Sequence, residues 1–330
     1  MKIDTSPTKY INSNSRPSWS KDGEKVAVEL GNRAVIVDTN RQELQTLGNE
    51  GAWSSSPTFD PDSDSVVYSS FDRYPGSQDS GWGVYSKNLK SGQVDLLARN
   101  GRKPLYSPNG DEVVYMGFYG PKYDNRLTMM EEDGSGQSPV VPQGTLQNEY
   151  QFDNDGDRLV YQTYGDEKPE IRILDKNWGK DQLLTDGQGG EFWDRGPQWS
   201  PDESKVLFER HGRNLEGERI VDLWTVDVNT GKETRIPLPE AQHMDPAWSP
   251  DGSKIAFMSN MDGGGWYDLY TVDPDGKELD HTVDAYGDQH SPSWSPDGKK
   301  LAYLTFDWLK PKEYQHTVHF LDTGSQRETG

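Results

Sequence analysis

The sequence contains no cysteine, so neither disulfides nor thiol chemistry can contribute to its fold or function. No run of about 18 apolar residues occurs, and the first ten residues carry no apolar segment typical of a signal peptide. We therefore expect no membrane insertion. Basic residues are also scarce, with 34 Lys and Arg against 55 Asp and Glu, for a net charge of −21. A surface of this charge repels phosphate backbones, so we expect no nucleic-acid partner.

The missing cysteine and the missing signal-peptide segment do not decide the cellular compartment of the protein. We expect a periplasmic or extracellular protein, with no signal peptide present in this numbering, and a cytoplasmic location stays open. What the chain does have is aromatic bulk: 11 Trp, 16 Tyr and 9 Phe, together with 34 Gly and 21 Pro. Helical periodicity is absent. This composition indicates many short strands joined by tight turns.

A segment of about twelve residues recurs seven times along the chain. The copies begin at Pro17, Pro57, Pro104, Tyr150, Pro197, Pro246 and Pro292. Their aromatic anchors are Trp19, Phe59, Tyr106, Phe152, Trp199, Trp248 and Trp294. Each copy reads as a strand, a Pro-Asp-Gly type turn and an apolar strand, and two further strands follow. We therefore predict an all-β fold, a seven-bladed β-propeller of four-stranded antiparallel blades, with residues 1–330 forming one domain and the residues before Pro17 supplying or bordering a strand of the last blade.

The late copies, such as "PAWSPDGSKIAF" from Pro246 and "PSWSPDGKKLAY" from Pro292, resemble the TolB-type propeller repeat, a relative of the WD repeat. The resemblance spans nearly the whole chain, although the second to fourth copies replace the tryptophan. It implies a seven-bladed propeller. It implies less about function, because propellers of this type occur as binding modules, as enzymes and as gating domains of peptidases.

The loops divide into two classes. Turns such as "SPDG" are short and have a local structural reason. The connections on the opposite face are long, for example "SFDRYPGSQDSGWG" from Ser70 and "FDWLKPKEYQH" from Phe306. Long loops on a rigid scaffold are where sites are usually built, so we expect the ligand on this long-loop face, at the mouth of the central channel.

Four of the six histidines fall in loops of this face. They are His211, His243, His290 and His316. One hypothesis is a divalent metal (manganese, zinc or iron) held by some of these four with help from Asp245 or Gln289. His243 and His290 are 47 residues apart, about one blade, which predicts that they are neighbours around the axis. Oligogalacturonate lyases are similar in using a seven-bladed propeller with histidines that hold a metal. Alternatively, these histidines cap strand ends and bond to neighbouring blades.

A second hypothesis needs no metal, because arginines and aromatic residues share the same loops. Guanidinium groups pair with carboxylates or sulfates, and aromatic rings stack on sugars. The candidate ligand-binding residues are Arg73, Trp82, Tyr123, Arg126, Trp193, Arg210, Trp266 and Trp308. For a lyase, a base would remove the proton next to a uronate carboxylate, and the candidate catalytic residues are His243, His290, Arg195 and Tyr267. Alternatively, the aromatics wedge between blades and the arginines pair with abundant acids.

Two functions remain open at this level. The first is a binding propeller, expected to be a monomer, that recognises a glycan or a protein on the long-loop face. The second is a polysaccharide lyase or hydrolase acting on an acidic saccharide, with or without assistance from the metal. No catalytic pattern is specific enough to decide whether the protein is an enzyme, and we favour the first function.

Overall fold

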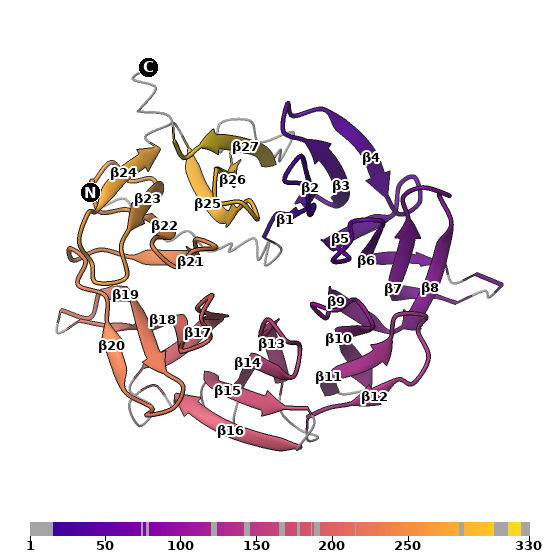
Figure 1. Ribbon diagram of the computed structural model, residues 1–330, viewed down its shortest axis with the longest axis horizontal. Helices are drawn as coiled ribbons and strands as arrows, with labels where there is room; N and C mark the ends of the chain where they lie inside the picture. Colours follow the sequence, from indigo (N-terminus) through magenta and orange to yellow (C-terminus); the bar gives the residue numbers. More distant parts are fainter. Residues whose placement is uncertain are drawn as a thin grey trace.

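The computed structural model is a ring of seven sheets, seen along its axis in Figure 1. It describes residues 16–73, 75–76, 79–119, 124–141, 146–164, 169–176, 179–185, 187, 192–214, 216–283, 287–306 and 316–324. Within these ranges, no helix is long and apolar enough to cross a membrane.

Blades 1 to 3 are four-stranded antiparallel meanders. Blade 1 contains β1 (Ser18–Trp19), β2 (Lys25–Leu30), β3 (Arg33–Asp38) and β4 (Glu43–Leu47). Blade 2 contains β5 (Trp53–Phe59), β6 (Ser65–Arg73), β7 (Ser80–Asn88) and β8 (Val94–Arg99). Blade 3 contains β9 (Gly101–Tyr106), β10 (Glu112–Tyr119), β11 (Asp124–Glu131) and β12 (Ser138–Pro139).

Blades 4 to 6 repeat this arrangement. Blade 4 contains β13 (Leu146–Phe152), β14 (Arg158–Tyr164), β15 (Pro169–Asp175) and β16 (Lys180–Thr185). Blade 5 contains β17 (Trp193–Trp199), β18 (Lys205–Arg213), β19 (Arg219–Asp227) and β20 (Glu233–Arg235). Blade 6 contains β21 (His243–Trp248), β22 (Ile255–Ser259), β23 (Asp268–Val272) and β24 (Asp280–Val283).

Blade 7 has three strands among the described residues: β25 (Asp288–Trp294), β26 (Lys300–Phe306) and β27 (His316–Asp322). The seven-bladed all-β fold of antiparallel meanders is therefore confirmed. The strand expected from the residues before Pro17 falls on residues 1–15, which lie outside the described residues.

Hydrogen bonds within the turn explain why the sequence Ser-Pro-Asp-Gly recurs. In blade 6, the buried Ser249 hydroxyl donates to Asp251 Oδ1 (2.6 Å) and accepts the backbone N–H of Lys254 (2.9 Å). Gly252 follows with φ of 71°, a conformation that a side chain disfavours. The same serine-to-carboxylate bond recurs at Ser200 and Ser295, so these motifs are turn chemistry.

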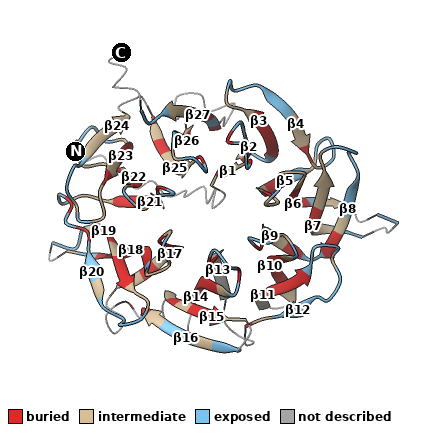
Figure 2. Ribbon diagram, in the orientation of Figure 1, coloured by how far each residue is buried: buried red, intermediate tan, exposed pale blue. Residues whose placement is uncertain are grey.

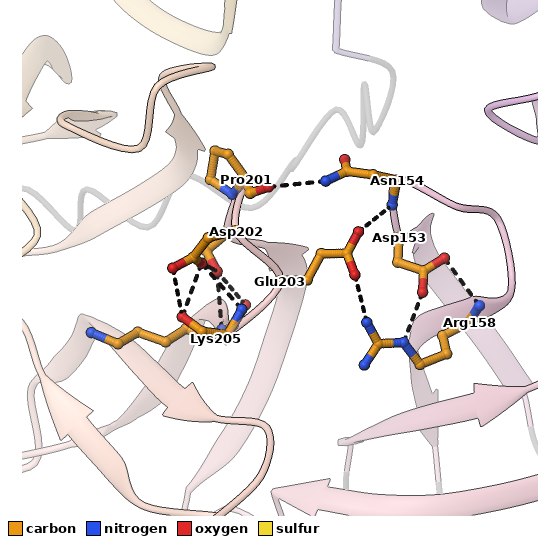
Figure 3. Close-up of polar contacts among 9 residues, drawn as sticks. Asp153, Asn154, Arg158, Pro201, Asp202, Glu203 and Lys205 are labelled. Atoms are coloured by element: carbon orange, nitrogen blue, oxygen red, sulfur yellow. Dashed lines mark hydrogen bonds and ion pairs between the residues drawn. The ribbon is translucent and has the colours of Figure 1, made fainter.

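Blade 5 departs from this pattern in a way that ties it to blade 4 (Figure 3). Glu203 replaces the glycine of the turn and adopts φ of 58°. Its carboxylate accepts the backbone N–H of Asn154 (2.9 Å) and pairs with Arg158 of blade 4 at 2.7 Å. Asn154 also donates to Pro201 O (2.9 Å). These contacts between blades offset the backbone strain that a non-glycine residue carries at positive φ.

The core lies between the blades. Buried apolar residues concentrate in the middle strands of each blade (Figure 2) and form clusters that join one blade to the next. For example, Leu207 and Leu223 of blade 5 pack with Phe257 and Tyr270 of blade 6. Stability of the ring therefore depends on interfaces between sheets, where both faces of each sheet are buried.

The ring closes through the same contacts that join consecutive blades. Val26 and Val28 of blade 1 pack with Leu304 and Val318 of blade 7. The indole N–H of Trp19 donates to Ser293 O (3.0 Å), the residue before the aromatic anchor of blade 7. In the interface between blades 6 and 7, the indole N–H of Trp294 makes the equivalent bond to Ala247 O (3.1 Å).

Replacing Ser249 with alanine should destabilise the protein by about 1 to 2 kcal/mol, because the N–H of Lys254 loses its acceptor. The midpoint of urea unfolding measures this change. Ser253→Ala is the matched control, since the hydroxyl of Ser253 is exposed and bonds only to Asp251. Equal destabilisation by the two variants would show that the turn network is not the source of stability.

Ring closure predicts that Trp19→Phe and Trp294→Phe destabilise the protein by similar amounts, about 1 kcal/mol each, because each removes one equivalent hydrogen bond. Thermal and urea unfolding of the two variants test this. If Trp294→Phe were destabilising and Trp19→Phe neutral, the ring would be open in solution between blades 7 and 1.

Candidate functional site

The innermost strands of six blades carry a distortion at one fixed place, directly before the residue that begins the repeat. In blades 2 to 7 the strand shifts register there by a β-bulge. The residues at this position are Ser56, Lys103, Glu149, Gly196, Asp245 and Ser291, with φ between 45° and 61°. Arg16 occupies the same place before Pro17 in blade 1. We call these seven residues the bulge ring.

The bulge removes the N–H of the ring residue from the ladder of its own blade, and the preceding blade supplies the acceptor instead. Gly196 N–H donates to Glu149 Oε2 (2.7 Å), Asp245 N–H to Glu209 Oε1 (2.7 Å) and Ser291 N–H to Asp245 Oδ2 (3.1 Å). Such bonds are needed because a buried N–H without a partner is costly. They draw carboxylates into the wall of the central channel.

A cavity of about 330 Å³ fills the channel at this level. All seven blades line it, through the bulge ring, the two residues that follow each of its first five members, and Glu209. Its charged lining residues are Arg16, Lys103, Glu149, Glu209 and Asp245. Since the innermost strands surround the axis (Figure 1), the cavity is the part of the molecule where side chains from every blade converge.

The cavity shifts the pKa values of the groups that line it. Burial, followed by repulsion from Glu209, raises the pKa of Asp245 to about 6. Burial lowers the pKa of Lys103 to about 8, although Glu149 opposes this. Burial is the largest single influence on Glu209 and raises its pKa, but His211, the N–H of Asp245 and Arg16 together outweigh burial, and the pKa is lowered. The cavity therefore holds charges of both signs, and one carboxyl that titrates near neutral pH.

Arg16 is the cation whose position is most informative. Burial lowers the pKa of its guanidinium, and attraction by Asp245, Glu209 and Glu149 opposes that change. Yet within the described part of the chain Arg16 belongs to no ion pair at 4.0 Å or less. The guanidinium thus lies near three carboxylates and is bonded to none of them.

The structure brings two of the four predicted histidines together. His290 Nε2 lies 3.2 Å from His316 Nδ1, and the two rings meet edge to face. His290 Nδ1 also lies 3.1 Å from Ser291 Oγ. Burial, with a smaller contribution from His316, lowers the pKa of His290 to about 3, so both imidazoles are neutral at pH 7.

His243 is separated from this pair by its place in the repeat. The aromatic anchors Trp248 and Trp294 are 46 residues apart, whereas His243 and His290 are 47 apart. This offset of one residue turns the two imidazoles to opposite faces of their strands. His243 packs on Phe257 towards blade 5, and its ring nitrogens bond to Ser259 Oγ (2.9 Å) and Pro239 O (2.8 Å).

His211 belongs to a third environment. Its Nε2 lies 2.7 Å from Glu209 Oε2, its Nδ1 lies 3.1 Å from Arg219 Nη2, and Trp193 stacks on its ring. Arg195 lies opposite Glu209 in the register of blade 5. Among the described residues, no group of three or more His, Asp or Glu side chains is arranged to hold a metal ion. The proposed metal site stays a prediction.

The other predicted ligand-binding residues are dispersed. Arg210 is buried in a bidentate pair with Asp194, which stabilises the interior of blade 5. Arg126 lies over the ring of Tyr119, and the hydroxyl of Tyr267 donates to Gln242 (2.8 Å).

Trp266 is half-buried next to the glycine-rich loop of blade 6. Arg73 and Trp82 lie at the long-loop end of blade 2. Tyr123 and Trp308 lie outside the described residues.

Sequence reasoning missed two features. The bulge ring was not recognised as a set. A sequence pattern does identify it, because six of its seven members directly precede a proline. Asp245 was named only as a helper to histidines. Trp53, which is 61% exposed, was also missed, because it begins a strand and does not lie in a long loop.

Several known proteins are similar in sequence to parts of this chain. Residues 118–266 match the model of the TolB beta propeller domain. The chain is 32% identical over 126 residues to the Tol-Pal system protein TolB of Dinoroseobacter shibae, a match that covers 38% of this chain and 27% of that protein. A second TolB, from Zymomonas mobilis, is 32% identical over 80 residues, 24% of this chain and 16% of its own length. The matches thus cover only about a quarter or less of these relatives.

Solved structures match over more of the chain. A TolB protein from Agrobacterium tumefaciens superimposes with a TM-score of 0.57 at 17% identity, covering 86% of this chain and 94% of that one. An oligogalacturonate lyase from Vibrio parahaemolyticus gives a TM-score of 0.70 at 10% identity, covering 94% and 89%. At such identities the likeness concerns the fold alone. The repeat and the blade architecture show a seven-bladed β-propeller, and residues 118–266 resemble the propeller domain of TolB.

Proposed function

We propose that this propeller is a binding protein that takes a segment of a partner protein into the cavity of its central channel. The observation that carries the proposal is Arg16, a guanidinium that faces a cavity of about 330 Å³ and is engaged in no ion pair within the described residues. A cation in this position is suited to a carboxylate from the ligand, since guanidinium and carboxylate bond in a bidentate way.

The rest of the lining supports a peptide over a polyanion. Glu149, Glu209 and Asp245 place negative charge around Arg16, which repels a chain of closely spaced uronates or phosphates. A peptide segment with one acidic side chain also brings backbone N–H groups, and these can bond to the carboxylates. The match to Tol-Pal system proteins supports a protein ligand and, within this proposal, a periplasmic or extracellular location.

The histidine environments support binding over lyase chemistry. A base that removes a proton from a substrate needs a free ring nitrogen within reach of it. Both ring nitrogens of His243 contact protein atoms, and those of His290 contact Ser291 and His316. Burial lowers the pKa of both imidazoles. No specific observation in the structure favours the lyase or hydrolase.

Peptides selected for binding from a displayed random library should lose at least tenfold in affinity for Leu105→Trp and for Arg16→Gln. Leu105 lines the cavity, so the larger side chain fills it, while Arg16→Gln removes the cation that pairs with the acidic residue of the peptide. Tenfold corresponds to about 1.4 kcal/mol. Fluorescence polarisation of labelled peptides measures the affinity.

The matched control is Lys21→Gln, which removes an exposed cation on the turn face that pairs with Asp62. It should leave affinity unchanged. Peptides that bind Leu105→Trp as tightly as the unaltered protein would show that the channel is not the binding site.

Asp245→Asn should make the protein more stable at pH 7.5, and this gain should shrink as the pH falls towards 4. The folded pKa of Asp245, about 6, lies above that of an unfolded aspartate, about 3.9, so its ionisation costs stability as the pH rises through this window. Asparagine keeps an acceptor for the N–H of Ser291.

Urea unfolding of both proteins at pH 7.5, 6 and 4.5 measures the difference. Glu240→Gln, a change on the surface away from the cavity, serves as the control for an altered net charge. A stability difference that stays constant with pH would mean that Asp245 has an ordinary pKa.

A further inference from the structure

Blade 2 presents a row of aromatic side chains that the channel does not use. Trp53 of β5 pairs in register with Phe71 of β6, and Phe71 pairs with Trp82 of β7. Partners directly opposite each other on neighbouring strands share one face of the sheet. Phe71 and Trp82 meet edge to face with ring centroids 5.7 Å apart. We call Trp53, Phe71 and Trp82 the aromatic row.

Two side chains of the aromatic row are exposed, and Trp82 is half-buried. Trp53 is 61% exposed and Phe71 46% exposed. In the described part of the chain, the other large apolar side chains with comparable exposure are single residues in or next to the outermost strands of blades 1, 2, 4 and 6. Exposed apolar side chains that adjoin one another mark a binding site more often than single ones do.

Two arginines flank the row. Arg73 follows Phe71 by two residues on β6, so it shares the same face of the sheet, and it is exposed. Arg102 reaches across from β9 of blade 3 and places its guanidinium carbon 4.1 Å from the centroid of the Trp82 ring. Neither guanidinium is part of an ion pair among the described residues, although acidic residues far outnumber basic ones in the chain.

The size of the row favours a saccharide over a protein. Neighbouring strands lie about 4.8 Å apart, so three rings on three strands form a strip about 10 Å long. A stable protein interface buries about 800 Å² on each partner, which is far more than this strip offers. A strip of this size suits two or three sugar rings, whose C–H faces stack on aromatic rings.

The arginines define the charge of the ligand. An acidic sugar places a carboxylate or sulfate beside its ring, where Arg73 or Arg102 can pair with it in a bidentate way. The row and its arginines thus offer both of the interactions that such a ligand needs.

We propose that the aromatic row, with Arg73 and Arg102, is a binding site for short acidic oligosaccharides, separate from the cavity of the central channel. The row begins at Trp53, three residues before the bulge-ring residue Ser56 on the same strand, and runs outward from the axis to Trp82. A partner that enters the channel and a saccharide on the row can therefore be bound side by side.

Isothermal titration calorimetry tests this with defined hexasaccharides of galacturonate, guluronate and heparin, and with cellohexaose as the neutral probe. We expect at least one acidic hexasaccharide to bind. Trp53→Ala and Phe71→Ala should each weaken that binding at least tenfold. Arg73→Gln should weaken binding of the acidic probe and leave any binding of cellohexaose unchanged. Both aromatic side chains are exposed, so folding should be retained.

Controls separate the row from the channel and from general surface effects. Leu44→Ala, which truncates a 49% exposed side chain on blade 1, and the channel-filling Leu105→Trp should both bind the saccharide as the unaltered protein does. The proposal is overturned if none of the three acidic probes binds, or if Trp53→Ala and Phe71→Ala leave binding unchanged. Loss of peptide binding in Trp53→Ala, with no saccharide bound, would assign the row to a protein partner.

Discussion

The structure depends on one backbone constraint, the N–H group that each bulge in an innermost strand frees from its own sheet. That group faces the interior of the ring and needs an acceptor, and where the structure shows the bond the acceptor is a side chain of the preceding blade. Glu29 accepts from Ser56, Ser69 from Lys103, and Glu209 from Asp245. The three acceptors occupy the same place on the second strand of their blades. Hydrogen bonding thus links the blades in sequence around the axis and lines the channel with polar groups.

The charged groups that line the channel differ in how fully they are paired, and this difference bears on the proposed function. Glu209 serves both the N–H of Asp245 and the imidazole of His211, so it remains ionised although it is buried. Asp245 lies beside it and carries a raised pKa, and Arg16 has carboxylates nearby but, among the described residues, no ion pair. Charges that are buried and incompletely paired cost stability. Retaining them in a cavity that all seven blades line is the physical reason to regard it as a binding site.

The sequence predicts the architecture well because the repeat is local. The hydrogen bonds of the recurring turn lie within six residues of sequence, and the aromatic anchors recur at nearly even steps, so strand order and blade number can be read directly. The site is harder to predict because it depends on which face of its strand each side chain occupies, and a shift of one residue reverses that face. An offset of one residue separates His243 from His290, and the bulge changes which side chains face the channel. Arg16 lies outside every long loop, and its significance appears only once seven strands surround it.

A crystal structure of the protein bound to a selected acidic peptide tests the central claim most directly. The account predicts that the peptide enters the central channel, with a carboxylate oxygen within about 3 Å of the Arg16 guanidinium and backbone N–H groups facing Glu149 or Asp245. A peptide bound along the outer strands, or across the face of the short turns with the channel cavity unfilled, would contradict the account.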